Sequence, residues 1–314
     1  MEYIKLNKRD MQLVEILSQN SRKNIHEIAK ELKVSKQAIH KKMEKIKDKK
    51  ILKFITLLNY FKLGYNNAHL YFKIQGLKRD EYFKKIDEIK RIKNISWITN
   101  LMGDYDLSLS IFFKDVNSLS LTLNKIYEIF GNSIRDQAFH LIQKQFASHV
   151  NFEKNKKIVE IGKSGFNEPS NTAKKIIKLI ESNSRFEWSQ LISELKLNYQ
   201  TIKKQIKLLE DDGVILGYST ILNYSSMGYS WNICVLNISY GHSQESILAR
   251  LKSEKNIPFI SITVDGNIIF DFVSRNYEEL KDFLDSLKIA YPLEIKDYKI
   301  LNVLSLKKLE YFND

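Results

Sequence analysis

Residues 28–52, IAKELKVSKQAIHKKMEKIKDKKIL, combine a regular apolar stripe with a dense run of lysines. From Lys33 to Lys53 the chain carries nine Lys against one Glu and one Asp, in a protein whose formal net charge is +13. A lysine run on its own is typical of a solvated helix face. The spacing of the apolar residues therefore has to decide whether this face has a partner.

The apolar spacing in this stretch predicts a helix with one buried side. Ser35 is expected to cap the helix, which should end near Lys47. Ile39, Met43 and Ile46 follow the i, i+4, i+7 spacing of a core-facing stripe. A helix over residues 8–19, a shorter one over residues 25–32 and a tight turn at residues 33–34 come before it. This order is the helix-turn-helix layout, in which the last helix lies in the major groove of DNA.

The outward side of the predicted helix is rich in long hydrogen-bond donors. Gln can pair with adenine through two hydrogen bonds, and Lys can reach guanine acceptors or phosphates. Further lysines would neutralise phosphates and give affinity without sequence choice. The partner predicted on these grounds is double-stranded DNA. The predicted contact residues are Ser35, Lys36, Gln37, His40, Lys41 and Lys45.

The sequence contains an internal repeat. Residues 28–65 resemble residues 192–229 at a spacing of 163, which becomes 164 after one inserted residue near Gly213. The chain is therefore predicted to be a tandem duplication. Residues 170–213 carry eight basic and six acidic residues, so the second head either binds DNA less tightly or serves mainly in packing. Its predicted DNA contacts are Tyr199, Gln200, Lys203, Lys204 and Lys207.

The remainder of each repeat alternates between strand-like and helix-like patterns. The first repeat reads as strand, helix, hairpin, helix, strand, which is the βαββαβ order of a ferredoxin-like module. The expected fold class is α+β, with two copies of a winged helix-turn-helix domain followed by a ferredoxin-like domain. The expected domains are a helix-turn-helix domain at 1–60, a ferredoxin-like domain at 61–148, a linker at 149–169, a second helix-turn-helix domain at 170–224 and a second ferredoxin-like domain at 225–314.

Composition narrows the class of protein further. A pI near 9.4 favours an anionic partner, nucleic acid before an acidic membrane surface. No apolar run is long enough to span a membrane, and a single cysteine, Cys234, fits a reducing compartment. The histidines lack metal-ligand spacing, and no catalytic signature is present. We therefore expect a cytoplasmic protein that is not an enzyme and needs no cofactor or metal.

Three segments of the first repeat resemble the Lrp/AsnC (feast/famine) family of transcriptional regulators. They are residues 6–22, 25–39 and 51–65, and MGDYDL at 102–107 resembles the family's glycine-containing hairpin. The resemblance implies ferredoxin-like modules that pair sheet to sheet, self-association through these modules, and in many members an amino-acid effector. It places Gly103, Asp104, Tyr105 and Asp106 at the effector region. Gly and Asp also favour a plain hairpin turn, so this simpler interpretation stays open.

Two other functions remain compatible with the sequence. Sirohaem decarboxylases have the same two-part architecture, can be fused in tandem and need His and Arg to hold tetrapyrrole carboxylates. A non-specific architectural DNA-binding protein would share the basic helices but have no sequence preference. Most Lrp/AsnC members carry one unit, so a doubled chain could imitate their dimer, with its two heads reading unequal half-sites.

Overall fold

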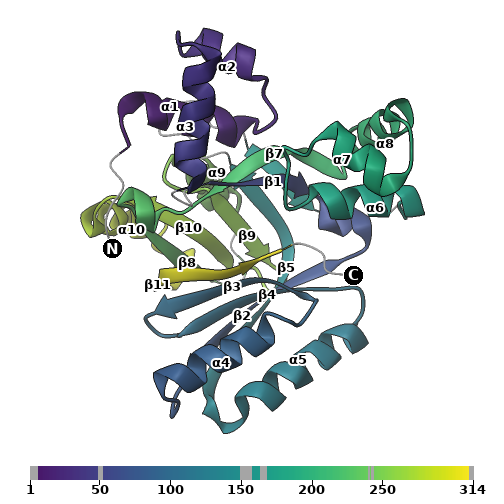
Figure 1. Ribbon diagram of the computed structural model, residues 1–314. Coiled ribbons are helices and arrows are strands. Elements are labelled where there is room, and N and C mark those ends of the chain that lie inside the picture. The colour runs from purple at the N-terminus through teal and green to yellow at the C-terminus, as the bar shows by residue number, and fades with distance from the viewer. Residues whose placement is uncertain are drawn as a thin grey trace.

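The computed structural model describes residues 6–48, 52–148, 158–162, 168–239, 241 and 244–310. The two halves of the chain present their helices and strands in closely similar order (Figure 1). The elements of the first half are α1 (Lys8–Gln19), α2 (Ile25–Glu31), α3 (Lys36–Asp48), β1 (Leu52–Leu58), β2 (Asn66–Ile74), α4 (Arg79–Ile89), β3 (Ile95–Met102), β4 (Leu107–Phe113), α5 (Val116–Phe130) and β5 (Ile134–Ser148). Those that follow are β6 (Ile158–Gly162), α6 (Asn171–Ile180), α7 (Trp188–Leu195), α8 (Tyr199–Asp211), β7 (Ile215–Leu222), β8 (Ser230–Ile238), α9 (Glu245–Ser253), β9 (Phe259–Thr263), β10 (Ile268–Ser274), α10 (Tyr277–Ala290) and β11 (Ile295–Leu309).

Local signals in the sequence account for the helices of the two heads, which we define as α1–α3 and α6–α8. Asn7 caps α1 in a capping box with Asp10, and Ser170 caps α6. The stripe of Ile39, Met43 and Ile46 is buried as expected, at 0%, 7% and 1% exposure. Helices α1 and α6 therefore start at side-chain caps, and α3 buries the predicted face.

The turns before α3 and α8 each contain a lysine in the left-handed backbone region. Lys33 has φ 53° and Lys196 has φ 54°, and they are the non-glycine residues with positive φ in the described part of the chain. Both side chains are exposed. Because a side chain in this region collides with its own backbone, each turn carries strain that glycine would not have.

Replacing either turn lysine by glycine is expected to stabilise the protein. Lys33→Gly and Lys196→Gly should each raise the free energy of unfolding by about 0.5–1 kcal/mol, because relief of strain exceeds the added flexibility of the unfolded chain. Urea denaturation would measure the change. Lys30→Gly, in the exposed interior of α2, is the control and should lower stability by about 1 kcal/mol. An equal loss of unfolding free energy in all three variants would contradict the claim that Lys33 and Lys196 are strained.

Strand β1 of the first head pairs antiparallel with β7 of the second. The register runs from Leu52 opposite Leu222 to Leu58 opposite Ile215. This two-stranded wing sheet lies between the heads and over the central strands (Figure 1). Each head thus completes its wing with a strand of the other head.

The two ferredoxin-like sheets join edge to edge and close into one barrel. The strand order is β2-β4-β3-β11-β8-β10-β9-β5, and β5 pairs again with β2. Strand β3 meets β11, and β5 meets β9, so both edges of each sheet are occupied. This is a correction to the sheet-to-sheet pairing that the resemblance implied. Closure removes the exposed edges that two separate sheets would leave.

Helices cover the barrel from outside. Helices α4 and α5 pack on the first sheet and lie below it in Figure 1, whereas α9 and α10 pack on the second. Buried Lys308 on β11 donates hydrogen bonds to the carbonyls of Lys90 (2.7 Å) and Ile92 (3.1 Å), beyond the end of α4. A lysine from a strand of the second module therefore binds carbonyls at the C-terminal end of a helix of the first module, where positive charge is favoured.

The linker predicted for residues 149–169 contains a strand. Residues 158–162 form β6, which pairs with β5. Residues 149–157 and 163–167 lie outside the described residues. In the described ranges, no helix is long and apolar enough to cross a membrane.

Candidate DNA-binding surface and barrel cavity

The predicted contact residues of the first head all lie on the solvent side of α3. Ser35, Lys36, Gln37, His40, Lys41 and Lys45 are exposed. The Ser35 hydroxyl accepts a hydrogen bond from the Ala38 amide at 3.2 Å, so its exposed position also caps the helix. Gln37 and Lys41 lie one turn apart and extend from the same face.

The Lys45 side chain forms an ion pair within the first head that the sequence did not predict. Its ammonium lies 3.8 Å from a carboxylate oxygen of Asp10, which also forms an ion pair with Lys42. Asp10 is 1% exposed. Burial alone would raise the pKa of Asp10, but the hydrogen bonds from Lys42 and the Asn7 amide and the charges of Lys42 and Lys45 hold it below its usual value. This ion cluster fastens α3 to α1.

The predicted residues of the second head are likewise exposed along α8. They are Tyr199, Gln200, Lys203, Lys204 and Lys207. Tyr199 packs against Trp188 with ring centroids 4.8 Å apart, and Lys207 is 2.6 Å from Asp211. Gln200 and Lys204 therefore remain the unencumbered pair, matching Gln37 and Lys41.

The heads are fastened to each other by a reciprocal contact, which we call the Ser-Arg clasp. It consists of Ser21, Arg22, Ser184 and Arg185. The serine hydroxyls hydrogen-bond to each other, and both serines are fully buried. Arg22 Nη1 donates to the Ser184 carbonyl at 2.9 Å, and Arg185 Nη1 donates to the Ser21 carbonyl. Each head thus gives the other the same bond that it receives, as across a two-fold axis.

Aromatic rings support both arginines of the clasp. The Arg22 guanidinium lies 3.7 Å from the ring centroid of Phe186 and 5.3 Å from that of Tyr218 on β7. Arg185 lies 5.7 Å from the ring of Phe54 on β1. Such contacts stabilise a partly desolvated cation. The predicted sites did not include the clasp, although Asn-Ser-Arg occurs at residues 20–22 and again at 183–185.

Three of the four residues of the hairpin assigned to an effector, Gly103, Tyr105 and Asp106, make close contacts within the fold. Tyr105 is 5% exposed and packs near Tyr71 in the core. The Asp106 carboxylate accepts a hydrogen bond from the Ile74 amide at 2.8 Å. Gly103 has φ 138°, and a side chain there would approach the Ile300 carbonyl to 3.0 Å.

Of the four hairpin residues, Asp104 leaves its carboxylate towards solvent. Its side chain is 58% exposed, and one carboxylate oxygen lies 3.7 Å from the Lys299 ammonium on β11. The geometry thus agrees with the simpler interpretation of a hairpin turn.

A cavity of about 190 Å³ lies inside the barrel. All eight barrel strands contribute to its lining, and β1 and β7 contribute from the wing sheet. On β2 the alternation of side chains sends Asn67, His69 and Tyr71 to the cavity, while the apolar residues between them face the helices. The cavity therefore has a mainly apolar wall in which a few polar side chains are set.

The cavity holds a carboxyl group, that of Asp271 on β10, deep in the fold. Burial raises the pKa of Asp271 to about 7, and the neighbouring Trp231 indole N–H lowers it. Asp271 in turn adds to the effect of burial in raising the pKa values of Tyr71 and Tyr224. A lone carboxyl in an otherwise apolar strand, residues 268–274, is the sequence signal that could have marked this site.

The register of the strands shows that the two halves of the cavity differ chemically. His69 on β2 pairs with Ser110 on β4, and at the corresponding positions Ile233 on β8 pairs with Asp271 on β10. Burial, with a smaller contribution from nearby His140, lowers the pKa of His69 to about 3. His69 is therefore neutral at pH 7, and the cavity carries one acidic side only.

Asp271→Asn is expected to stabilise the protein at alkaline pH. In the native state the carboxyl keeps its proton up to about pH 7, whereas in the unfolded chain it ionises near 3.8. As pH rises, the carboxyl ionises first in the unfolded state. Asp271 therefore lowers the free energy of unfolding progressively between about pH 3.8 and pH 7. The gain in unfolding free energy from Asp271→Asn should therefore be about 2–3 kcal/mol larger at pH 8 than at pH 5. Urea denaturation at both pH values would test this, and an equal gain at both would contradict it.

Among the described residues, no cluster of His, Cys, Asp and Glu could hold a metal ion. Two basic helix-turn-helix heads on a closed α+β barrel define a DNA-binding class of protein. Residues 170–215 match the model of the winged helix-turn-helix DNA-binding family.

Sequence relatives narrow this class. The uncharacterized HTH-type transcriptional regulator PH1692 of Pyrococcus horikoshii is 30% identical over 134 residues, which are 41% of this chain and 86% of the relative. The regulator LrpB of Bacillus subtilis is 24% identical over 135 residues, 42% of this chain and 87% of the relative. The chain belongs to the HTH-type transcriptional regulators.

Two solved structures of the sirohaem decarboxylase NirDL match nearly the whole chain. The sirohaem decarboxylase NirDL superposes with a TM-score of 0.63, covering 98% of this chain and 95% of that chain at 13% sequence identity. At this identity the match concerns the fold. It extends over both heads and both ferredoxin-like modules, which the shorter regulators do not.

Proposed function

We propose that the protein is a sequence-specific transcriptional regulator of the Lrp/AsnC type, in which one duplicated chain takes the place of a dimer. The observation that carries this proposal is the matched outward faces of α3 and α8. Each presents an exposed Gln and an exposed Lys four residues later, on a helix that follows a tight turn. Each head would place these donors in the major groove.

The Ser-Arg clasp and the wing sheet support a fixed separation of the two half-sites. Buried serines, reciprocal arginine bonds and the β1–β7 pairing hold the heads in a defined arrangement. A rigid pair of heads selects half-sites separated by a defined number of base pairs. Selection from random double-stranded DNA is therefore expected to return two unequal half-sites at a single spacing. Enrichment of isolated half-sites, or of no sequence, would contradict the proposal.

Loosening the clasp is expected to relax the spacing and leave the half-site sequences intact. Arg22→Ala combined with Arg185→Ala removes both reciprocal bonds and the ring contacts of both arginines. In the same selection, this variant should accept several spacings where the unmodified protein accepts one. Arg135→Ala, an exposed arginine on β5, is the control. An unchanged single spacing in the double variant would show that the clasp does not set the separation.

We further propose that an amino-acid effector binds at the β3–β4 hairpin. Asp104, near Lys299, is the residue there with a carboxylate available to an α-amino group. Asp104→Ala should then weaken the response of DNA binding to an amino acid without changing DNA affinity in its absence. Retardation assays with single amino acids would test this.

The second candidate function is that of a sirohaem decarboxylase-like enzyme. The full-length fold match favours it. The cavity speaks against it, because its described lining contains no Arg or Lys to pair with tetrapyrrole carboxylates. Its volume of about 190 Å³ is also below the roughly 300–1,000 Å³ typical of sites for drug-sized ligands. Absorbance titration with an iron porphyrin should show no binding, and a shifted absorbance band would favour the enzyme.

A further inference from the structure

The barrel cavity combines one carboxyl group with aromatic walls. Trp97 and Trp231 line it with ring centroids 5.6 Å apart, and Tyr224 lies 5.8 Å from Trp231. Tyr71 faces the same space and lies within electrostatic reach of Asp271. Aromatic faces and a carboxylate are the two groups that proteins use to hold organic cations.

The polar atoms of the lining offer acceptors that lack donors. The amide oxygen of Asn67, a residue 1% exposed, and the hydroxyl of Thr220, 8% exposed, have no hydrogen-bond partner within the described chain. The amide nitrogen of Asn67 is already bonded to Ser110, at 2.7 Å. Buried polar atoms of this kind usually have a partner, and the indole nitrogen of Trp231, a donor in the same lining, also lacks one within the described chain.

Charge excludes other occupants. A carboxylate ligand would lie beside Asp271 with no described Lys or Arg in the lining to offset the repulsion. A metal ion would need several ligands in one cluster, and the described residues offer none. A neutral molecule can hydrogen-bond to the protonated carboxyl of Asp271 but gives its ionised form no counter-charge, and an uncompensated charge is costly in a buried site.

We propose that the barrel cavity binds a small organic ammonium ion, with Asp271 as its counter-ion and Tyr71, Trp97, Trp231 and Tyr224 as its aromatic walls. The ammonium donates hydrogen bonds to the carboxylate, and its apolar body fills the space between the rings. Asp271 must ionise to bind it, so binding below neutral pH releases a proton. The other titratable groups of this region are His69 and nearby His140, whose pKa values are lowered chiefly by burial, and the phenols of Tyr71 and Tyr224, whose pKa values are raised chiefly by burial. The Tyr60 phenol also lines the cavity and hydrogen-bonds to Gln145, and burial raises the pKa of Cys234, on the outer side of β8.

Three probes of similar shape and different charge test the site. Benzylamine, benzyl alcohol and benzoate are titrated separately into the full chain at pH 7.5 in a calorimeter, without DNA. Benzylamine is expected to bind at least tenfold more tightly than benzyl alcohol, and benzoate should not bind. At pH 6 the heat of benzylamine binding should depend on the ionisation enthalpy of the buffer, which reports the released proton. Equal binding of the alcohol or benzoate, or no binding of benzylamine at millimolar concentration, would overturn the proposal.

Two variants complete the test. Asp271→Asn should weaken benzylamine binding at least tenfold and remove the proton release, and the stability predicted for it above keeps it folded. Asp282→Asn, an exposed carboxylate on α10, is the matched control and should bind as the unmodified protein does. Unchanged benzylamine binding by Asp271→Asn would overturn the role of the carboxylate.

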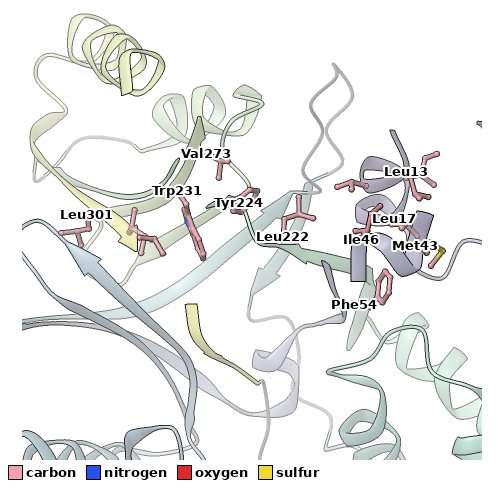
Figure 2. Packing of buried hydrophobic residues seen from close by; sticks show 14 of the residues in the cluster. Leu13, Leu17, Met43, Ile46, Phe54, Leu222, Tyr224, Trp231, Val273 and Leu301 are labelled. Atoms are coloured by element: carbon pink, nitrogen blue, oxygen red, sulfur yellow. The ribbon is translucent and has the colours of Figure 1, made fainter. Parts of the chain in front are cut away.

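The position of the cavity connects it to the heads, and this step rests on the proposed function. Ile55 and Leu57 of β1 and Leu222 of β7 form part of the lining. Trp231, in the wall, belongs to the same hydrophobic cluster as Leu17 of the first head (Figure 2). An occupant that contacts both the barrel and the wing sheet raises the population of the arrangement of the heads that binds it better.

Saturating benzylamine is therefore expected to change the Kd for DNA at least threefold, and Asp271→Asn should abolish the change. An unchanged Kd despite calorimetric binding would refute the coupling alone. Absence of all DNA binding would refute the proposed function. The calorimetry without DNA would still show whether the cavity binds an organic ammonium ion.

Discussion

Gln37→Ala combined with Gln200→Ala is expected to abolish sequence choice while leaving most of the non-specific affinity for DNA. Both glutamines are exposed, and each is the second residue of its helix, Gln37 in α3 and Gln200 in α8. This is the part of a recognition helix that meets base edges. Each paired contact to a base contributes about 1–3 kcal/mol of discrimination. The double variant should therefore lose about 2–6 kcal/mol of preference for the selected site over a scrambled one, measured by competition. The lysines on both faces remain and continue to neutralise phosphates.

Single variants divide this effect between the half-sites. Gln37→Ala should alter preference at one base position of one half-site, and Gln200→Ala at one position of the other. Gln137→Ala, an exposed glutamine on β5 remote from the heads, is the control. If the double variant selected the same sequences as the unmodified protein, base readout by the glutamines would be wrong.

Asp10→Ala is expected to cost about 3–5 kcal/mol of folding stability, because it leaves the Lys42 ammonium beside a buried site without its partner. It also removes half of the capping box at the start of α1. Urea denaturation at pH 7 would measure the loss. The contribution of Asp10 is present above its unfolded pKa of about 3.8 and disappears as pH falls through the lower native value, so the variant and the unmodified protein should converge in acid.

The second head supplies the control for this prediction. At a spacing of 163, Ala173 and Gln205 occupy the positions of Asp10 and Lys42. Asp10→Ala combined with Lys42→Gln copies that pair, removes the unpaired charge and should recover most of the lost stability. A double variant as unstable as Asp10→Ala alone would show that the ion pair is not the cause.

Those parts of the fold that depend on neighbouring residues could be predicted from the sequence. Asn7 and Ser35 mark helix starts, and the stripe of Ile39, Met43 and Ile46 marks the buried side of α3. Capping and periodicity act within a few residues, so they are visible in one sequence. The exposed faces of α3 and α8 followed from the same periodicity.

The parts that join distant segments could not be predicted in this way. Barrel closure depends on β3 meeting β11 and β5 meeting β9, pairings that no local pattern specifies. The inward position of Asp271 was hidden for a related reason. Both faces of β10 are buried, one against helices and one against the cavity, so alternation alone did not show which face was the interior. The clasp was missed because its two halves lie 163 residues apart.

Retardation of short double-stranded DNA at low ionic strength tests the central claim most directly. Purified protein should retard duplexes of any sequence, and log K should fall linearly with log salt concentration as bound counterions are released. A selected site carrying both half-sites should remain bound at salt concentrations that release scrambled DNA. Absence of retardation for every duplex at low ionic strength would contradict the assignment of α3 and α8 as DNA-reading helices.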